Sequence, residues 1–224
     1  MNKKYEFVPG DEIVIAPGRT VKRIRALVAI SFLASPGTLG GYIESEKSLD
    51  ETGNAWVSGD ARVSGNARVS GNAWVYGDAR VYGDARVYGN ARVSGNALVS
   101  GDARVYGNAL VYGNALVSGN ALVSGNAWVS GNARVSGNAL VSGDARVYGD
   151  GLVVWFSHVG TENGTLTVYN TKDNTLEVIR GCFRGTIDEF LAASEKTHDD
   201  QTHLEYRMLI EVAYSRITRA RSKT

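Results

Sequence analysis

The sequence has little of what most catalytic and membrane proteins require. Its 224 residues include one cysteine, three histidines and three prolines, with a formal net charge of +1. A single cysteine excludes an internal disulfide and suits a reducing compartment. Because no histidine lies near Cys182 in the sequence, we expect this thiol to be a small buried hydrophobe and not a nucleophile. The near-zero net charge provides no overall attraction to nucleic acid or to a membrane.

Long apolar runs are also absent. The most apolar stretch, residues 26–34, is far too short to cross a bilayer. Met1-Asn2-Lys3-Lys4 is followed by Tyr-Glu-Phe and not by the apolar run of a secretory signal. The sequence therefore predicts a cytoplasmic protein with no membrane partner.

Repetition is what the sequence has in abundance. From Gly53 to Tyr148 a six-residue unit recurs sixteen times without insertion: Gly, Asn or Asp, Ala, a variable residue, Val, then Ser or Tyr. In an extended segment the Ala and Val, two positions apart, point to the same side. Glycine adopts turn conformations that a Cβ would penalise, and Asn and Asp bond locally to the backbone. Because a strand this short buries nothing alone, the units must stack into a solenoid.

The repeat spacing resembles that of a known family. Val57 is followed four positions later by Ala61, as in every later pair, which resembles the hexapeptide-repeat family. The resemblance implies a left-handed parallel β-helix of triangular cross-section with three hexads in each coil. The array would then make a little over five coils and stand roughly 25 Å tall, at ~4.8 Å between stacked strands. We predict an all-β solenoid, a left-handed parallel β-helix, with a β-rich N-terminal cap and a C-terminal cap of a β-meander plus two helices.

Turn residues and composition divide the chain into three segments: an N-terminal β cap, the β-helix and a C-terminal cap, over residues 1–52, 53–150 and 151–224. In the first segment, Gly and Pro turns bound an expected strand over 12–15, and β-branched residues indicate another over 21–30. Ile43 and Leu49 are already six apart. We expect them to form an imperfect first rung of the solenoid.

The last segment changes from strands to helices. We expect a β-meander over 151–182, with turns between three strands at 152–157, 165–169 and 175–179. Thr186 and Glu189 form the pattern of a capping box, which predicts a helix over about 187–197. Apolar residues at three- and four-residue spacing predict a second helix over about 201–220.

The two flanks carry a second resemblance. Residues 37–44 (GTLGGYIE) and 181–190 (GCFRGTIDEF) are similar to uncharacterised repeat proteins of bacteriophages and prophages. This similarity extends over nearly the whole chain. It implies a phage or prophage origin, and hence the host cytoplasm, but no defined activity.

Catalytic chemistry has few candidates. Many hexapeptide-repeat proteins are acyltransferases with a histidine base, and others resemble carbonic anhydrases with three zinc-binding histidines. The repeats contain no His, Cys, Glu or Lys, so neither set of residues carries over. His158 is a weak catalytic candidate. His198-Asp199-Asp200 with His203 is metal-like in composition, but these residues are also normal at helix ends, so we expect neither metal nor cofactor.

Columns eighteen residues apart are the other candidates for function. One column stacks three arginines beside two tyrosines: Arg68, Arg86 and Arg104, with Tyr88 and Tyr106. Stacked guanidinium groups repel one another, so either Asp84 and Asp102 compensate them or they form an anion site, with the rings available to a base or sugar. An asparagine ladder is expected on another face at Asn54, Asn72, Asn90, Asn108 and Asn126.

Outward apolar residues crowd the middle of the array: Leu98, Leu110, Leu116, Leu122, Trp128 and Leu140. Scattered apolar side chains on a surface need no explanation, whereas a belt of this extent indicates self-association or a partner surface. We favour the second interpretation and predict a homo-oligomer.

The sequence leaves three functions open. The favoured one is a non-enzymatic binding scaffold, phage-encoded, that inhibits by capturing a host factor or a small anionic ligand, as an anti-defence protein would. The alternative is a hexapeptide-type acyltransferase that uses His158. The third is a glycan-binding or tail-associated surface that uses Trp56, Trp74 and Trp128, which share one predicted column.

Overall fold

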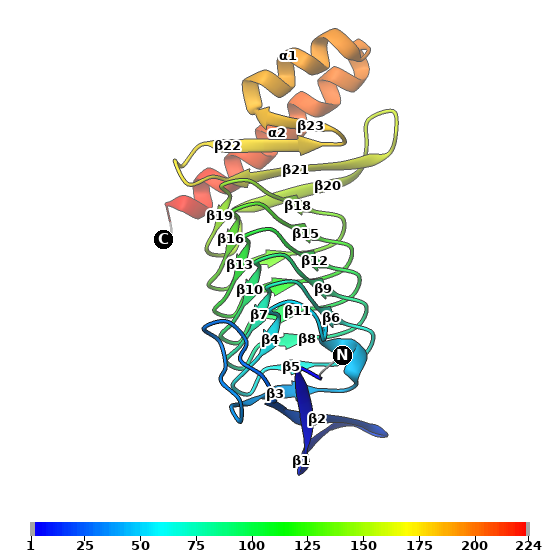
Figure 1. Cartoon of the computed structure of the whole chain (residues 1–224). Coiled ribbons are helices and arrows are strands. Elements are labelled where there is room, and N and C mark those ends of the chain that lie inside the picture. Colours follow the sequence, from blue (N-terminus) through cyan, green and yellow to red (C-terminus); the bar gives the residue numbers. More distant parts are fainter. Residues whose placement is uncertain (1–2, 223–224) are drawn as a thin grey trace.

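The computed structural model describes residues 3–222. It shows a stack of coils with a strand-rich segment at each end and two helices at the C-terminal end (Figure 1). The outermost residues of the first and last predicted segments, 1–2 and 223–224, lie outside the described residues. No helix in the described part of the chain is both long and apolar enough to cross a membrane.

The repeats form a parallel β-solenoid of about six turns. Each hexad contributes one two-residue strand, its variable residue and its valine: β4 (Trp56–Val57), β5 (Arg62–Val63), β6 (Arg68–Val69), β7 (Trp74–Val75), β8 (Arg80–Val81), β9 (Arg86–Val87), β10 (Arg92–Val93), β11 (Leu98–Val99), β12 (Arg104–Val105), β13 (Leu110–Val111), β14 (Leu116–Val117), β15 (Leu122–Val123), β16 (Trp128–Val129), β17 (Arg134–Val135), β18 (Leu140–Val141) and β19 (Arg146–Val147). Each strand pairs with the third strand along, as Arg92 does with Leu110, so a coil is three hexads. This confirms the predicted eighteen-residue columns.

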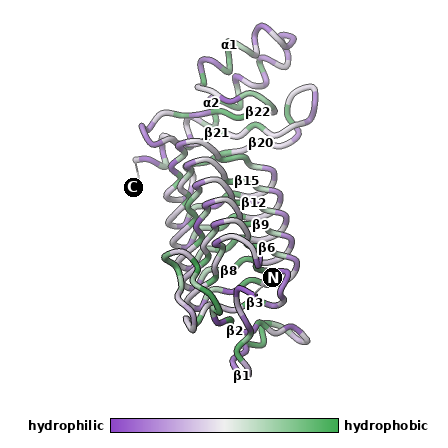
Figure 2. The backbone as a smooth tube through the Cα atoms, viewed as in Figure 1, coloured by the Kyte–Doolittle hydropathy of each residue, from purple (hydrophilic) through white to green (hydrophobic). Residues whose placement is uncertain are grey.

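Three parallel sheets make the faces of the solenoid. We name them by their first hexad strand: the β4 face (β4-β7-β10-β13-β16-β19), the β5 face (β5-β8-β11-β14-β17, continued below by β3) and the β6 face (β6-β9-β12-β15-β18). The Ala and Val side chains of every hexad point inward and are buried, which makes the core a continuous column. Hydrophilic residues recur at the bends of the coils (Figure 2).

Two separate features of the backbone require glycine at the first position of the hexad. Gly101 has φ +68°, and a Cβ there would lie 3.0 Å from the backbone nitrogen of Gly119 in the next coil. Both the left-handed conformation and the close approach of the next coil therefore exclude larger residues. The following Asp102 is free to face solvent.

The N-terminal segment covers the first coil. Strands β1 (Tyr5–Ala16) and β2 (Arg19–Ala26) form an antiparallel hairpin, β2 pairs with β3 (Leu39–Ile43), and a short 3-10 turn, η1 (Glu46–Ser48), follows. Ile43 pairs with Val63 and Leu49 with Val69, which confirms the imperfect first rung.

The strand expected over 21–30 is shorter than predicted. It ends at Ala26, because residues 27–35 form loops closed by an Ile30–Ala34 bridge. Ser31 in this stretch has φ +46°, a conformation outside the strand region.

The C-terminal segment has one strand more than predicted. Its antiparallel sheet contains β20 (Val153–Val159), β21 (Gly164–Asn170), β22 (Leu176–Arg180) and β23 (Phe183–Thr186). The tight turn between β22 and β23 contains Cys182, whose side chain is exposed, so the expectation of a buried thiol was wrong. A two-residue turn leaves no neighbouring chain to cover it.

This sheet closes the last coil and carries the helices. Strand β21 contacts β18 and β19, and Ala145 pairs with Thr171. Helix α1 (Ile187–Thr197) packs on β22 and β23, and α2 (Asp200–Arg221) packs on β20 and β21. The predicted capping box is present: Thr186 accepts from the Glu189 nitrogen and the Glu189 carboxylate accepts from the Thr186 nitrogen.

Candidate functional site

Three arginines stand in a row on the β6 face. Arg68 pairs with Arg86, and Arg86 with Arg104, in adjacent parallel strands, so the side chains are one strand spacing apart, about 4.8 Å. All three are exposed. Within residues 3–222 none of their guanidinium groups forms an ion pair or a side-chain hydrogen bond. Three like charges are therefore held side by side by the backbone register alone.

The expected compensation by carboxylates does not occur through contact. Asp84 accepts a hydrogen bond from Asn66 Nδ2 at 3.0 Å, one coil below. Neither Asp84 nor Asp102 forms an ion pair with the arginine row among the described residues. The row therefore remains available to an anion from outside the chain.

Two tyrosines stack beside the arginines. The rings of Tyr88 and Tyr106 are parallel within 4°, with centroids 4.9 Å apart. The same column holds serines at the coils below and above, Ser70 and Ser124. Because serine is small, the outer face of each ring has room beside it for a flat group.

A groove of about 670 Å³ is lined by the arginine row and by Tyr88, but not by Tyr106. Its floor is Ser70, the arginine row and Tyr88, and its rim is the segment 46–51, which forms the rung below. Glu46 on the rim is paired with Lys3 at 2.8 Å. Hydrogen bonds from Thr52, chiefly from its backbone nitrogen, lower the pKa of Asp50, which is therefore an ionised acceptor at neutral pH. The groove thus offers positive charge, a ring face and acceptor groups together.

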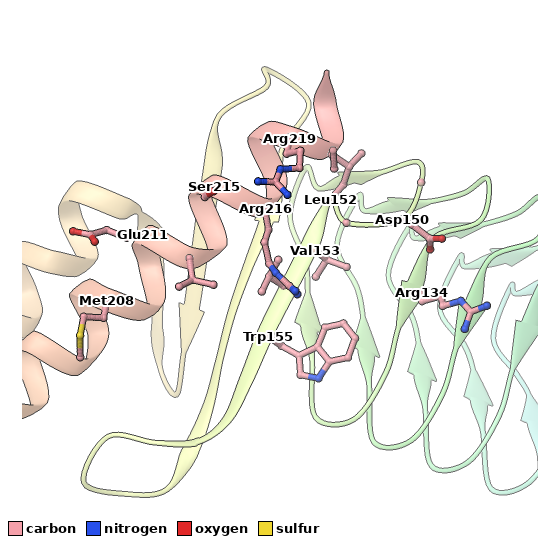
Figure 3. A pocket seen from close by; sticks show the side chains of 15 residues that line it. Arg134, Asp150, Leu152, Val153, Trp155, Met208, Glu211, Ser215, Arg216 and Arg219 are labelled. Atoms are coloured by element: carbon pink, nitrogen blue, oxygen red, sulfur yellow. The ribbon is translucent and has the colours of Figure 1, made fainter. Parts of the chain in front are cut away.

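A second, larger groove lies between α2 and the last coil (Figure 3). It encloses about 1300 Å³ and is lined by residues 149–155, by Arg134 and by one side of α2. This groove does not follow from the hexad spacing, because its walls meet only in three dimensions. The available signal was on α2, where Leu204, Met208 and Val212 recur every four residues outside its main apolar stripe.

The histidine candidates are placed as helix-end and turn residues. His158 is exposed in a bulge of β20 at φ +59°. His198 follows α1, and the His203 ring is 3.3 Å from the Ser194 hydroxyl. Asp199 begins α2: its carboxylate accepts from the Thr202 nitrogen at 2.7 Å, and this bond lowers its pKa. In the described part of the chain no three His, Cys, Asp or Glu side chains form a group able to hold a metal.

The predicted apolar belt is divided among three faces. Leu98 and Leu116 lie on the β5 face, Leu110 and Trp128 on the β4 face, and Leu122 and Leu140 on the β6 face. All are half-buried except Trp128, which is 41% exposed. The structure therefore brings these residues together as a ring around the solenoid, with two on each side, and not as one patch.

The tryptophan column exists, but its members differ. Trp56, Trp74 and Trp128 all lie on the β4 face, as predicted. Trp56 is fully buried under the N-terminal segment, so it cannot contact a glycan. Trp74 stacks on Tyr76 with centroids 4.0 Å apart, and the Arg146 guanidinium lies 4.1 Å above the Trp128 ring.

The asparagine ladder is present on the β4 face. Each amide donates to the next coil at 3.0–3.2 Å, as in the bond from Asn90 to Asn108, and the ladder ends on Asp144. Shorter runs of the same bond occur on the other faces. These amides tie the bends of successive coils together.

The stacked parallel turns make the chain a β-solenoid repeat protein. A family model described as the YdcK Beta solenoid repeat matches overlapping stretches of the array: 61–77, 73–89, 79–93, 85–101, 91–105, 103–119, 115–131, 127–142 and 133–149. These matches fall within the hexads that form the three faces. A comparison with curated proteins found no match.

Proposed function

We propose that the protein is a non-enzymatic binding scaffold whose β6 face holds a small anionic ligand that carries a planar ring. The observation that carries the proposal is the row of Arg68, Arg86 and Arg104. These guanidinium groups repel one another and have no counter-charge in contact among residues 3–222. An anion that bridges two neighbouring rungs would relieve this repulsion and accept charge-assisted hydrogen bonds.

The groups beside the arginine row restrict the chemical class of the ligand. Tyr88 and Tyr106 present ring faces, and base–aromatic stacking contributes roughly 1–3 kcal/mol per base. The rim carboxylates Asp50 and Glu51 are suited to accept from ligand N–H and O–H groups. A nucleotide or similar ring-bearing phosphate matches all three features. The groove lining contains neither histidine nor cysteine, which favours capture over catalysis.

The biological setting of this proposal rests on the flanking resemblance. The similarity of residues 37–44 and 181–190 to phage and prophage repeat proteins supports a phage-encoded protein in the host cytoplasm. There it would act by sequestering a host nucleotide or related anion. A rigid solenoid suits this role, since a preformed site loses little entropy on binding.

The test is ligand-dependent thermal stability. AMP, ADP, ATP, a cyclic dinucleotide, acetyl-CoA and inorganic phosphate are each added and Tm is measured. We expect at least one nucleotide to raise Tm on the order of 5 °C at ~100-fold excess over Kd. The variant R68A/R86A/R104A should lose the shift, whereas R62A/R80A, the matched change on the β5 face, should keep it.

Further variants separate charge from stacking. Tyr88→Leu should lower the affinity for the nucleotide and leave the affinity for inorganic phosphate unchanged. No shift with any probe, or an equal shift in the two arginine variants, would contradict the proposal. Acetyl-CoA could instead bind the R68A/R86A/R104A variant and be hydrolysed or transferred in a reaction that His158→Ala abolishes. That result would replace the anion-binding proposal by the acyltransferase alternative.

A further inference from the structure

The groove between α2 and the last coil has two different walls. One wall is formed by residues 149–155, which connect the last coil to β20 and include Leu152, Val153 and Trp155. Arg134 from β17 lies beside them. The other is a side of α2 that runs from Met208 to Ala220 (Figure 3). The thirteen residues from Met208 to Ala220 extend about 18 Å along the helix axis, so this is a long channel and not a compact pocket.

Helix α2 exposes an apolar stripe that its own fold does not use. Its buried residues, among them Tyr206, Ile210 and Ile217, face the sheet and α1. Leu204, Met208 and Val212 form a separate line at four-residue spacing and are 49%, 54% and 46% exposed. The line continues one turn beyond the groove, since Leu204 lies outside its lining. An extended stripe of this kind matches the length of another helix better than that of a small molecule.

Unpaired basic groups gather at one end of the channel. The guanidinium groups of Arg134, Arg216 and Arg219 form no ion pair or side-chain hydrogen bond among the described residues. Figure 3 shows Arg216 reaching from α2 toward Trp155, with Arg134 on the solenoid side. The C-terminal helix dipole accounts for Arg219, but not for Arg134, which comes from a different element.

The acidic groups are fewer, and the two of them lie at different ends of the channel. Asp150 and Glu211 also line the channel, so three arginines against two carboxylates leave a formal charge of +1. Asp150 lies on the solenoid side with Arg134, whereas Glu211 lies near Met208, at the other end (Figure 3). The end that holds Arg134, Arg216 and Arg219 therefore keeps three guanidinium groups against one carboxylate, beside Leu152, Val153 and Trp155 (Figure 3).

We propose that this channel binds an amphipathic helix of a partner protein, with acidic residues at the end that meets Arg134, Arg216 and Arg219. Its apolar residues, at i, i+3, i+4 and i+7, would pack first along the Leu204–Met208–Val212 stripe and then against Leu152, Val153 and Trp155. Its acidic side chains would pair with guanidinium groups from both walls. This inference is independent of the anion site on the β6 face.

The test uses three fluorescein-labelled peptide designs of about 16 residues, ~24 Å long as helices. The first has leucine at the anchor positions and is made in two orientations, with glutamate over its N-terminal half or over its C-terminal half. The second replaces every glutamate by lysine, and the third replaces every leucine by serine. Fluorescence polarisation with the full chain should give tight binding for the first peptide in one orientation and at least ~10-fold weaker binding for the other two, the size of a 1.4 kcal/mol contact.

Variants of the exposed residues locate the interaction. Val212→Glu and Arg134→Glu should each lower the affinity for the glutamate peptide at least ~10-fold. Arg134→Glu should raise the affinity for the lysine peptide. Tyr214→Glu is the matched control, because Tyr214 is 56% exposed on the same helix but does not line the channel. Unchanged Tm in all three variants ensures that folding is not the cause.

Several outcomes would overturn the proposal. Equal binding of the glutamate and lysine peptides, or equal effects of Val212→Glu and Tyr214→Glu, would show that the channel does not select an acidic helix. A dimer in sedimentation that Val212→Glu converts to monomer would identify a second copy as the occupant. Dodecyl phosphate binding that excludes the peptide would identify an amphiphile site instead.

Discussion

The Lys4 ammonium donates a hydrogen bond to the backbone carbonyl of Ala55 at 2.9 Å. Within the solenoid the alanine carbonyl accepts from a backbone nitrogen one coil earlier, as Ala73 does from Trp56. In residues 3–222, β4 is the outermost strand of the β4 face, so no coil lies below Ala55 and a side chain supplies the missing donor. Lys4 is 4% exposed, and this burial lowers its pKa to about 8.

This relationship predicts a pH dependence of stability. The folded pKa of Lys4, about 8, lies below its ordinary value of 10.5, so between these values the unfolded chain binds more protons. The free energy of unfolding should therefore rise with pH across this window. We expect the Tm of wild type minus that of Lys4→Met to increase from pH 8 to pH 10.5, because other titrations cancel in the difference. A flat difference would contradict the burial of this charge.

The glycine positions separate two kinds of strain. Gly101→Ala forces φ +68° on alanine and brings its Cβ to 3.0 Å from Gly119, whereas Gly181→Ala forces φ +57° with nothing within 4 Å. We expect a loss of about 1 kcal/mol for Gly181→Ala and about 2–3 kcal/mol for Gly101→Ala in urea unfolding. Gly149→Ala has neither problem and should stay within about 0.5 kcal/mol of wild type. Equal losses at positions 101 and 181 would mean that the coils can separate at little cost.

The solenoid could be predicted from sequence because its determinants are local and repeated. Val57 and Ala61 recur with a fixed period, and this period sets which residues are buried and which rungs meet. The arginine row and the tyrosine pair follow from the same arithmetic. The handedness of the solenoid cannot be predicted in this way, because a left-handed and a right-handed coil have the same repeat spacing.

Features that depend on contacts between distant segments were missed. Trp56 looked like a surface residue by its hexad position, yet the N-terminal segment packs against it: a Cβ on Gly40 would come within 2.8 Å of its ring. The rim formed by residues 46–51 and the channel beside Arg134 likewise arise where the array meets its flanks. Hexad periodicity carries no information about such meeting points.

The asparagine ladder should contribute measurable stability. Asn108→Ala removes the bonds to Asn90 and Asn126, at 3.0 and 3.1 Å. Because these bonds are exposed, we expect about 0.5 kcal/mol for each, or about 1 kcal/mol in urea unfolding. Asp102→Ala changes the same hexad position at a residue whose side chain forms no hydrogen bond among the described residues, and should be near neutral. Equal effects of the two substitutions would show that the asparagine ladder makes no net contribution to the free energy of unfolding.

At the C-terminal end, Tyr169 connects the last coil to the sheet that covers it. Its hydroxyl donates to Glu177 at 2.9 Å and lies 3.5 Å from Ser142 Oγ, and burial raises its pKa to about 12. Because the folded pKa exceeds the ordinary value of 10, the stability that favours the neutral phenol is present below pH 10 and is lost as pH rises through about 12. Tyr169→Phe should cost about 1 kcal/mol at pH 7, from the lost hydrogen bond, and should lose less stability than wild type between pH 10 and 12. Tyr82→Phe, at an exposed ring, is the control and should stay within about 0.5 kcal/mol of wild type at pH 7.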